Sequence, residues 1–219
     1  MKPLVIFLFV LFTCGNAVAQ IAYIRNGTEI RLIGSDGTND HRLWTHPDAT
    51  PELGINGLAW RPDRKELAFS SGHAAVASLY HADIYAIQPD GTGFRKLTNP
   101  PDVSEFKKFP KGSVTVTVRN DQPSYRQSQA SSGVFIIYVV GADEPQQATV
   151  PPGSAKTLTF NSVADFGNKA QAIVAMFGSY RWFIPGVDVQ AGRAVKAPVF
   201  SISGDGIEYF GAFRPVWRS

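Results

Sequence analysis

Cysteine is nearly absent from the chain, and this absence excludes several kinds of fold and site. The 219 residues include one cysteine, Cys14, and two methionines. Residues 15–219 therefore carry no disulfide framework and no cysteine metal site. Charged residues are also scarce, at 18% against the roughly 25% of an average soluble domain. The net charge of +3 is too small to indicate a nucleic-acid-binding face.

Long apolar runs and catalytic motifs are absent as well. After the N-terminal segment the longest apolar run covers residues 134–140, which is strand length and far short of the about 20 residues that span a bilayer. No Gly-x-Ser-x-Gly and no Walker-type phosphate loop occurs. Gly91-x-Gly93 and Gly204-x-Gly206 each lack the third glycine of a dinucleotide site. The sequence therefore predicts no catalytic residue, no cofactor and no later transmembrane segment.

The first 19 residues have the pattern of a secretory signal peptide. Lys2 precedes the unbroken apolar run Leu4–Phe12, and the small residues Ala17 and Ala19 then form an A-x-A cleavage site. The apolar run is too short for a transmembrane helix, although an uncleaved N-terminal anchor is the alternative. We predict cleavage after Ala19, which places the mature chain in the periplasm or outside the cell.

Cys14 offers a second route to the cell envelope. Bacterial lipoproteins are lipidated on a cysteine that follows Leu-x-(Gly/Ala/Ser). Here the residues are Leu11-Phe12-Thr13-Cys14, with threonine where a smaller residue is expected. We therefore favour the signal peptide over a lipoprotein anchored through Cys14.

An internal repeat occupies the first hundred residues. Residues 30–38 align with residues 84–92 at a shift of 54, and residues 21–23 align with residues 67–69 at a shift of 46. The difference of eight residues (54 − 46) locates an insertion in the second copy, between Ser70 and Ala82. Short alternating segments separated by turns predict blades of four-stranded antiparallel sheet, complete in the second copy and lacking the first strand in the first copy.

Several spaced motifs of the second copy carry a family resemblance. Trp60-x-Pro62-Asp63, Leu67-Ala68-Phe69-Ser70-Ser71, Asp83-Ile84-Tyr85 with Asp90-Gly91, and Leu97-Thr98 follow one another in order. This string resembles the WD-like repeat of TolB-like β-propellers. The resemblance implies a secreted or periplasmic protein that binds protein partners through its propeller faces.

The first turn of the repeat departs from the family pattern. The family has Ser-Pro-Asp-Gly, whereas Arg61 and Arg64 replace the serine and the glycine here. A positive φ at Arg64 would cost about 1 kcal/mol relative to glycine.

The ends of the chain indicate an incomplete propeller. After cleavage the chain begins at the second strand of a blade, and residues 213–219 resemble the start of another Trp-x-Pro-Asp motif. We therefore expect about two propeller blades in residues 20–98 and the start of a further, truncated blade in residues 201–219. A complete short protein with a chance match at its end is the alternative.

A second module is predicted between these repeat segments. Residues 99–111 contain paired prolines and several lysines, which is typical of a linker. Residues 112–200 contain alternating segments such as 113–118 and 156–160, and the run 134–140 predicts a central strand. About seven short strands predict an immunoglobulin-like β-sandwich. With no cysteine pair it is no antibody-type domain, and it resembles bacterial Ig-like adhesion modules. The fold class is all-β.

Four groups of side chains were considered as sites. His73, His81 and Asp83 bracket the insertion and could bind a metal, but no tight histidine spacing supports a metal site. The histidines, including His41 and His46, are therefore interpreted as loop or rim residues. Turn capping accounts for the aspartates of the repeat. The remaining two groups are Phe106–Phe109, interpreted as a solvated linker, and the tryptophans, interpreted as core residues. The aspartates are Asp36, Asp63 and Asp90, and the tryptophans are Trp44, Trp60, Trp182 and Trp217.

The sequence thus favours binding over catalysis. We expect a protein-interaction scaffold at the cell envelope, without metal, cofactor or nucleic acid. One alternative is the non-catalytic propeller of a prolyl-oligopeptidase-like hydrolase, whose catalytic domain would lie beyond Ser219. Another is a polysaccharide-binding surface protein. A Gly-x-Ser-x-Gly motif beyond Ser219 would favour the hydrolase, and a glycan array would test the polysaccharide interpretation.

The export prediction can be checked by intact-mass analysis of the secreted protein. We expect Gln20 to be the first residue, because Ala19 completes the cleavage site. A lipid adduct on Cys14 would contradict this and favour the lipoprotein.

Overall fold

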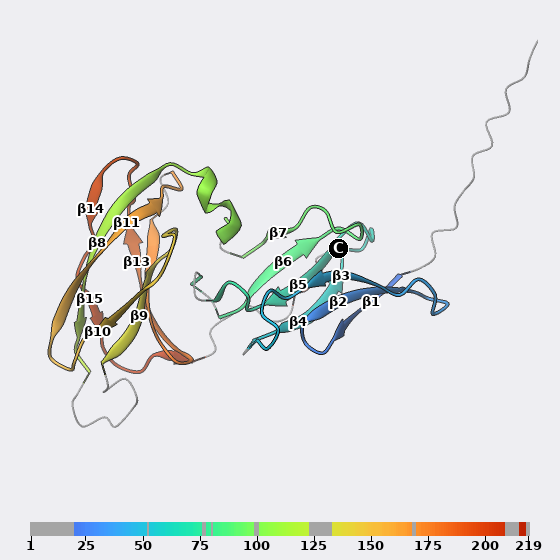
Figure 1. Cartoon of the computed structure of the whole chain (residues 1–219), viewed down its shortest axis with the longest axis horizontal. Helices are drawn as coiled ribbons and strands as arrows, with labels where there is room; N and C mark the ends of the chain where they lie inside the picture. The colour runs from blue at the N-terminus through green and yellow to red at the C-terminus, as the bar shows by residue number, and fades with distance from the viewer. Residues whose placement is uncertain are drawn as a thin grey trace, which may run out of the picture.

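The computed structural model describes an all-β protein, as the alternating segments predict (Figure 1). The described residues are 20–51, 53–75, 78–79, 81–98, 101–122, 133–167, 170–208 and 215–217. These parts of the chain form sixteen strands in four sheets, which are almost entirely antiparallel. The predicted signal peptide, residues 1–19, lies outside the described residues.

The two repeat copies form two separate sheets. The first has the order β1-β2-β3 and the second the order β4-β5-β6-β7. In the first copy Ile21 pairs with Ile33, and in the second copy the aligned residues Leu67 and Ile87 pair in the same way. The two copies therefore share the same pairing register between their equivalent strands. The strands are β1 (Gln20–Arg25), β2 (Glu29–Gly34), β3 (His41–Thr45), β4 (Ile55–Trp60), β5 (Leu67–Ser71), β6 (Asp83–Ile87) and β7 (Arg95–Lys96).

The same side-chain hydrogen bonds form the turn after β2 in the first copy and the turn after β6 in the second copy. Asp36 Oδ1 accepts from the backbone N–H of Thr38 at 3.0 Å and from its Oγ1 at 2.8 Å. Asp90 Oδ1 accepts from the same two groups of Thr92 at 2.9 and 2.7 Å. The glycine after each aspartate has a φ of 81° or 82°, which glycine adopts without steric cost. The predicted turn-capping role of Asp36 and Asp90 is confirmed.

The first turn of the second copy places an arginine in a conformation that favours glycine. Arg64 has a φ of 59°, and its guanidinium lies 6.0 Å from the centre of the Trp60 ring. Asp63 Oδ1 accepts from the N–H of Lys65 at 3.1 Å, which is the expected capping contact. The hydrogen-bonded guanidinium of Arg61 lowers the pKa of Asp63 to about 2. The turn thus forms with an arginine at the position of positive φ and with its aspartate cap intact.

An apolar core lies between the two repeat sheets. Phe69 and Tyr85 are fully buried in it, and Trp44 and Trp60 pack against its edge. Trp217, near the C-terminus, donates from its indole Nε1 to the carbonyl oxygen of Ala59 in β4, at 2.9 Å. The buried members of the core are Ile30, Ile55, Leu67, Phe69, Tyr85 and Ile87.

A buried ion pair joins the last two strands of the second repeat sheet. Lys96 Nζ lies 2.9 Å from Asp83 Oδ2, and both side chains are nearly inaccessible to solvent. Asp83 also accepts hydrogen bonds from Ser78 Oγ at 2.6 Å and from Thr98 Oγ1 at 2.7 Å. The carboxylate is therefore satisfied by one cation and two hydroxyl groups, which is the condition for keeping a charge inside a core.

Two further sheets enclose a second, larger core. One has the order β10-β9-β12-β13-β16, and in the other β8 pairs with β11 and, in parallel, with β14 and β15. Strand β9 is paired on both sides, as the prediction of a central strand requires. The strands are β8 (Lys111–Asn120), β9 (Val134–Val139), β10 (Gln146–Thr149), β11 (Ala155–Ala164), β12 (Gln171–Phe177), β13 (Tyr180–Val187), β14 (Ala194–Lys196), β15 (Phe200–Ile202) and β16 (Ile207–Glu208).

The second unit extends further than the sequence predicted. Phe200 and Ile202 of β15 are buried in its core, and β16 pairs with β13, so its sheets continue from residue 200 to residue 208. Gly206 rests against the Trp182 indole, and a Cβ added there would lie 2.9 Å from ring atom Cζ2. This contact gives Gly206 a packing role. Residues 209–214 and 218–219 of the predicted further blade lie outside the described residues.

The interpretation of Phe106–Phe109 as a solvated linker is wrong. These residues belong to the 3-10 helix η2 (Val103–Lys108) and its C-terminal cap. Phe106 is buried, and the rings of Phe106 and Phe109 lie 5.3 and 5.1 Å from that of Phe166. The aromatic side chains therefore attach the connection to the second unit. Within the described ranges, no helix has the length and apolarity needed to cross a membrane.

The Asp83–Lys96 pair predicts a large loss of stability when one partner is removed. We expect Lys96→Met to lower the free energy of unfolding by about 3–5 kcal/mol, because it leaves Asp83 buried without its cation. The double variant Asp83→Asn/Lys96→Met should be more stable than Lys96→Met. Urea unfolding measures both.

The matched control is Lys108→Met, which breaks the exposed pair with Glu105. Because both side chains are open to solvent, the expected loss is below about 1 kcal/mol. Equal losses for Lys96→Met and Lys108→Met would contradict the proposed importance of burial.

Candidate functional site

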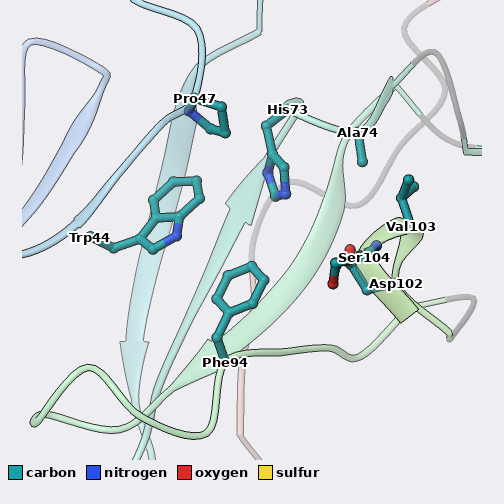
Figure 2. A pocket seen from close by; sticks show the side chains of 8 residues that line it. All are labelled: Trp44, Pro47, His73, Ala74, Phe94, Asp102, Val103 and Ser104. Carbon is teal, nitrogen blue, oxygen red and sulfur yellow. Dashed lines mark hydrogen bonds between the residues drawn. The ribbon is translucent and has the colours of Figure 1, made fainter. Parts of the chain in front are cut away.

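An aromatic pocket of about 540 Å³ opens beside the repeat sheets (Figure 2). Three elements supply its main side chains: β3, the loop after β5, and the chain that leads into and follows β7. Figure 2 shows three rings on one side of the space and the start of η2 on the other. The lining residues are Trp44, Pro47, His73, Ala74, Phe94, Asp102, Val103 and Ser104.

Planar rings form one wall of the pocket. Trp44 and Phe94 lie nearly parallel, with centroids 5.9 Å apart and an interplanar angle of 9°. The His73 ring lies 5.3 Å from Trp44 and 6.2 Å from Phe94. Behind them, Phe69 and Tyr85 of the core contact the same rings, at 4.9 Å from Trp44 and 5.3 Å from Phe94. The core therefore holds this wall in place.

A buried carboxylate lies on the opposite side. Asp102 is 6% exposed and caps η2, because its Oδ1 accepts from the N–H of Ser104 at 3.0 Å and from its Oγ at 2.7 Å. The Glu105 side chain in turn accepts from the Asp102 N–H at 3.3 Å, which completes a capping box. Asp102 Oδ2 is buried and has no hydrogen-bond partner among the described residues. One carboxylate oxygen is thus committed to the helix and the other is not.

His73 is neutral at physiological pH. Burial lowers its pKa to about 4, against the opposing influence of the Asp102 charge. Its Nδ1 lies 2.9 Å from Ser71 Oγ. With a neutral histidine, Asp102 is the one carboxyl side chain among the lining residues that the structure describes.

A second pocket, of about 380 Å³, lies where the repeat sheets meet the second unit. Arg181 of β13 enters it and is 3% exposed. Its guanidinium donates to the carbonyl oxygens of Ala75 at 2.7 Å and Ser78 at 2.9 Å. Burial lowers the pKa of Arg181 to about 10, so it remains a cation at neutral pH. These contacts make Arg181 a structural link between the two units.

The four histidines lie in different environments. His41 is exposed and its ring bonds to the carbonyl of Asn39, so the rim interpretation fits this residue. His46 and His81 are buried, and His46 lies edge-on to His73 at 5.9 Å. His46, His73 and His81 lie in loops, as interpreted, although His46 and His81 are buried, whereas His41 begins strand β3.

The structure does not bring the suggested metal ligands together as a metal site. The Asp83 carboxylate forms an ion pair with Lys96, and its side chain is nearly inaccessible to solvent. Among the described residues, no three histidine, aspartate or glutamate side chains are grouped as metal ligands. Of the tryptophans, Trp182 packs against the second core as predicted, whereas Trp44 both contacts the first core and lines the pocket.

The sequence did not predict the pocket, because three of its lining residues fall outside the repeat pattern. Trp44 aligns with Thr98 at the shift of 54, so this tryptophan has no counterpart in the second copy. His73 lies in the insertion, and Asp102 follows the end of the repeat. Residues that depart from a repeat are not needed for its common fold. The signal that points to these three residues is an aromatic or charged side chain at a position where the repeat pattern is broken.

Comparison with known proteins gives no relative, because no family model, curated protein or solved structure matches the chain.

The burial of His73 predicts a loss of stability in acid. The folded pKa is about 4 and the usual value is 6.5, so between these values the unfolded chain binds more protons than the folded chain. Stability therefore falls as the pH drops from about 6.5 to about 4. We expect His73→Gln to lose less stability over this range. Urea unfolding at several pH values measures the difference, and the exposed His41→Gln serves as control. Equal pH slopes for wild type and His73→Gln would contradict the prediction.

Proposed function

We propose that the chain is part of an exported TolB-like β-propeller with an immunoglobulin-like module, and that it acts by binding a protein partner at the cell envelope. The observation that carries the binding role is the preformed aromatic pocket with its buried carboxylate. Concave, largely apolar pockets with a few polar groups are typical ligand sites.

The paired repeat sheets support the propeller part of the proposal. Two sheets with equivalent register and equivalent turns pack through a shared apolar core, as neighbouring blades do. The first sheet has three strands where the second has four, which fits a blade whose innermost strand comes from elsewhere. Trp217 bonds to Ala59 in β4, so this C-terminal residue lies beside the first strand of the second sheet.

The two larger sheets support the immunoglobulin-like part. They share one continuous core that includes Phe135, Tyr138 and Phe200. Their mostly antiparallel strands, with β14 and β15 running parallel to β8 at its edge, are compatible with a β-sandwich of this class.

The pocket chemistry favours binding over catalysis. Ser71 and His73 are within hydrogen-bond distance, but Ser71 is 1% exposed, so its hydroxyl is not accessible as a nucleophile. Within the described part of the chain, no hydrogen bond to the Asp102 side chain orients His73. Asp102 Oδ1 accepts from Ser104, and its Oδ2 has no hydrogen-bond partner among the described residues. The described residues at the pocket thus lack the arrangement that activates a nucleophile.

Site-specific photo-crosslinking in the source cells tests the proposal. A crosslinking residue at Val103, on the pocket wall, should give a discrete adduct that excess unlabelled protein suppresses. The same residue at the exposed position Lys156 of β11 is the matched control and should give no such adduct. Absence of an adduct at Val103 would count against a protein partner. Turnover of an ester or peptide that one serine or histidine substitution abolishes would instead favour an enzyme.

A further inference from the structure

We infer that the pocket formed by Trp44, His73, Phe94 and Asp102 binds an organic cation, namely an alkylammonium group. The inference rests on the proposed binding function and specifies its ligand chemistry. The group could belong to a small quaternary ammonium compound or to a lysine side chain of a partner.

The first argument is the aromatic wall. The rings of Trp44 and Phe94 lie nearly parallel and border the open space, with His73 beside them (Figure 2). Ring faces attract ammonium and guanidinium groups through the aromatic quadrupole, and tryptophan does so most strongly. A volume of about 540 Å³ is sufficient for a trimethylammonium group with its stem.

The second argument is the unbalanced charge of Asp102. The buried carboxylates of the repeat sheets have cationic partners: Glu66 is paired with Arg61 and Arg95, and Asp83 with Lys96. Asp102 is as buried as Glu66, yet within the described ranges no lysine, arginine or histidine forms an ion pair with it. A buried carboxylate without a counter-ion is costly, and a bound cation would offset that cost.

The surrounding charges favour a cation over other ligands. The low pKa of His73 keeps it neutral at pH 7, so it does not compete for the Asp102 charge. Lys96 is held by Asp83, and Lys108 is directed to Glu105. An anion would be repelled by Asp102, and a neutral apolar ligand would cover the carboxylate without compensating it.

Binding of choline and of its neutral isostere 3,3-dimethylbutan-1-ol to the mature chain tests the inference. Both ligands fill the same volume, so they differ in charge alone. By isothermal titration calorimetry, with ligand-observed NMR for weak binding, we expect choline to bind at least tenfold more tightly. Equal affinity for the two ligands, or no binding of either choline or Nα-acetyl-lysine methylamide, would overturn the inference.

Asp102→Asn and Phe94→Leu assign the binding to the pocket. Asparagine is a good helix N-cap, so Asp102→Asn removes the charge and keeps the bond to Ser104. We expect choline affinity to fall at least tenfold in Asp102→Asn and severalfold in Phe94→Leu, which retains apolar bulk. The control Glu144→Gln, at an exposed carboxylate, should bind as wild type does. Unchanged affinity in Asp102→Asn would overturn the inference.

Two further comparisons separate the possible sources and the two proposals. Tighter binding of Nα-acetyl-lysine methylamide than of choline would indicate a lysine side chain as the natural ligand, and the reverse a small quaternary ammonium compound. If the Val103 adduct forms but no cation binds, the cation inference is wrong and the scaffold proposal stands. If choline binds through Asp102 but no adduct forms, the scaffold proposal is wrong and the cation site stands.

Discussion

The buried ion pair between Asp83 and Lys96 is the interaction on which the rest of the structure depends. It joins β6 to β7, and its carboxylate also holds Ser78, a residue of the insertion. The carbonyl of Ser78 accepts a hydrogen bond from Arg181, which lies in the second unit. The carboxylate therefore binds β7 and the insertion directly, and the second unit is linked to it through Ser78. Because both charges are inaccessible to solvent, removing either partner would leave the other charge buried and unpaired.

This network also explains where the aromatic pocket forms. The insertion begins after β5 ends at Ser71 and returns to the sheet at Asp83, and the hydrogen bond from Ser78 to Asp83 joins it to β6. His73 then packs against Tyr85 of the core, at a ring distance of 4.6 Å. The rings of Trp44 and Phe94 complete a wall that is formed in the structure without a ligand. A preformed wall reduces the entropy lost on binding.

Charge is distributed unevenly between the structural and the candidate binding regions. Glu66 has two arginine partners, and the hydrogen-bonded guanidinium of Arg95 lowers its pKa. Asp102 has only the hydrogen bonds of its helix cap on one oxygen. The capping bonds engage Oδ1, and Oδ2 has no hydrogen-bond partner among the described residues. A single residue thus has a structural role through one oxygen and is available for a ligand through its charge.

The sequence alone determined the features that depend on neighbouring residues. Alternating side chains specified the strands, and the Asp-Gly-Thr turns after β2 and β6 repeat the same local hydrogen bonds, because an aspartate reaches its own backbone two residues later. Only the tertiary structure decided which distant groups meet. Arg181 contacts Ser78 across 103 residues, Phe106 packs on Phe166, and Asp102 faces Trp44 across the pocket. No periodicity encodes these pairings, since they follow from how the four sheets pack and from which charges that packing removes from water.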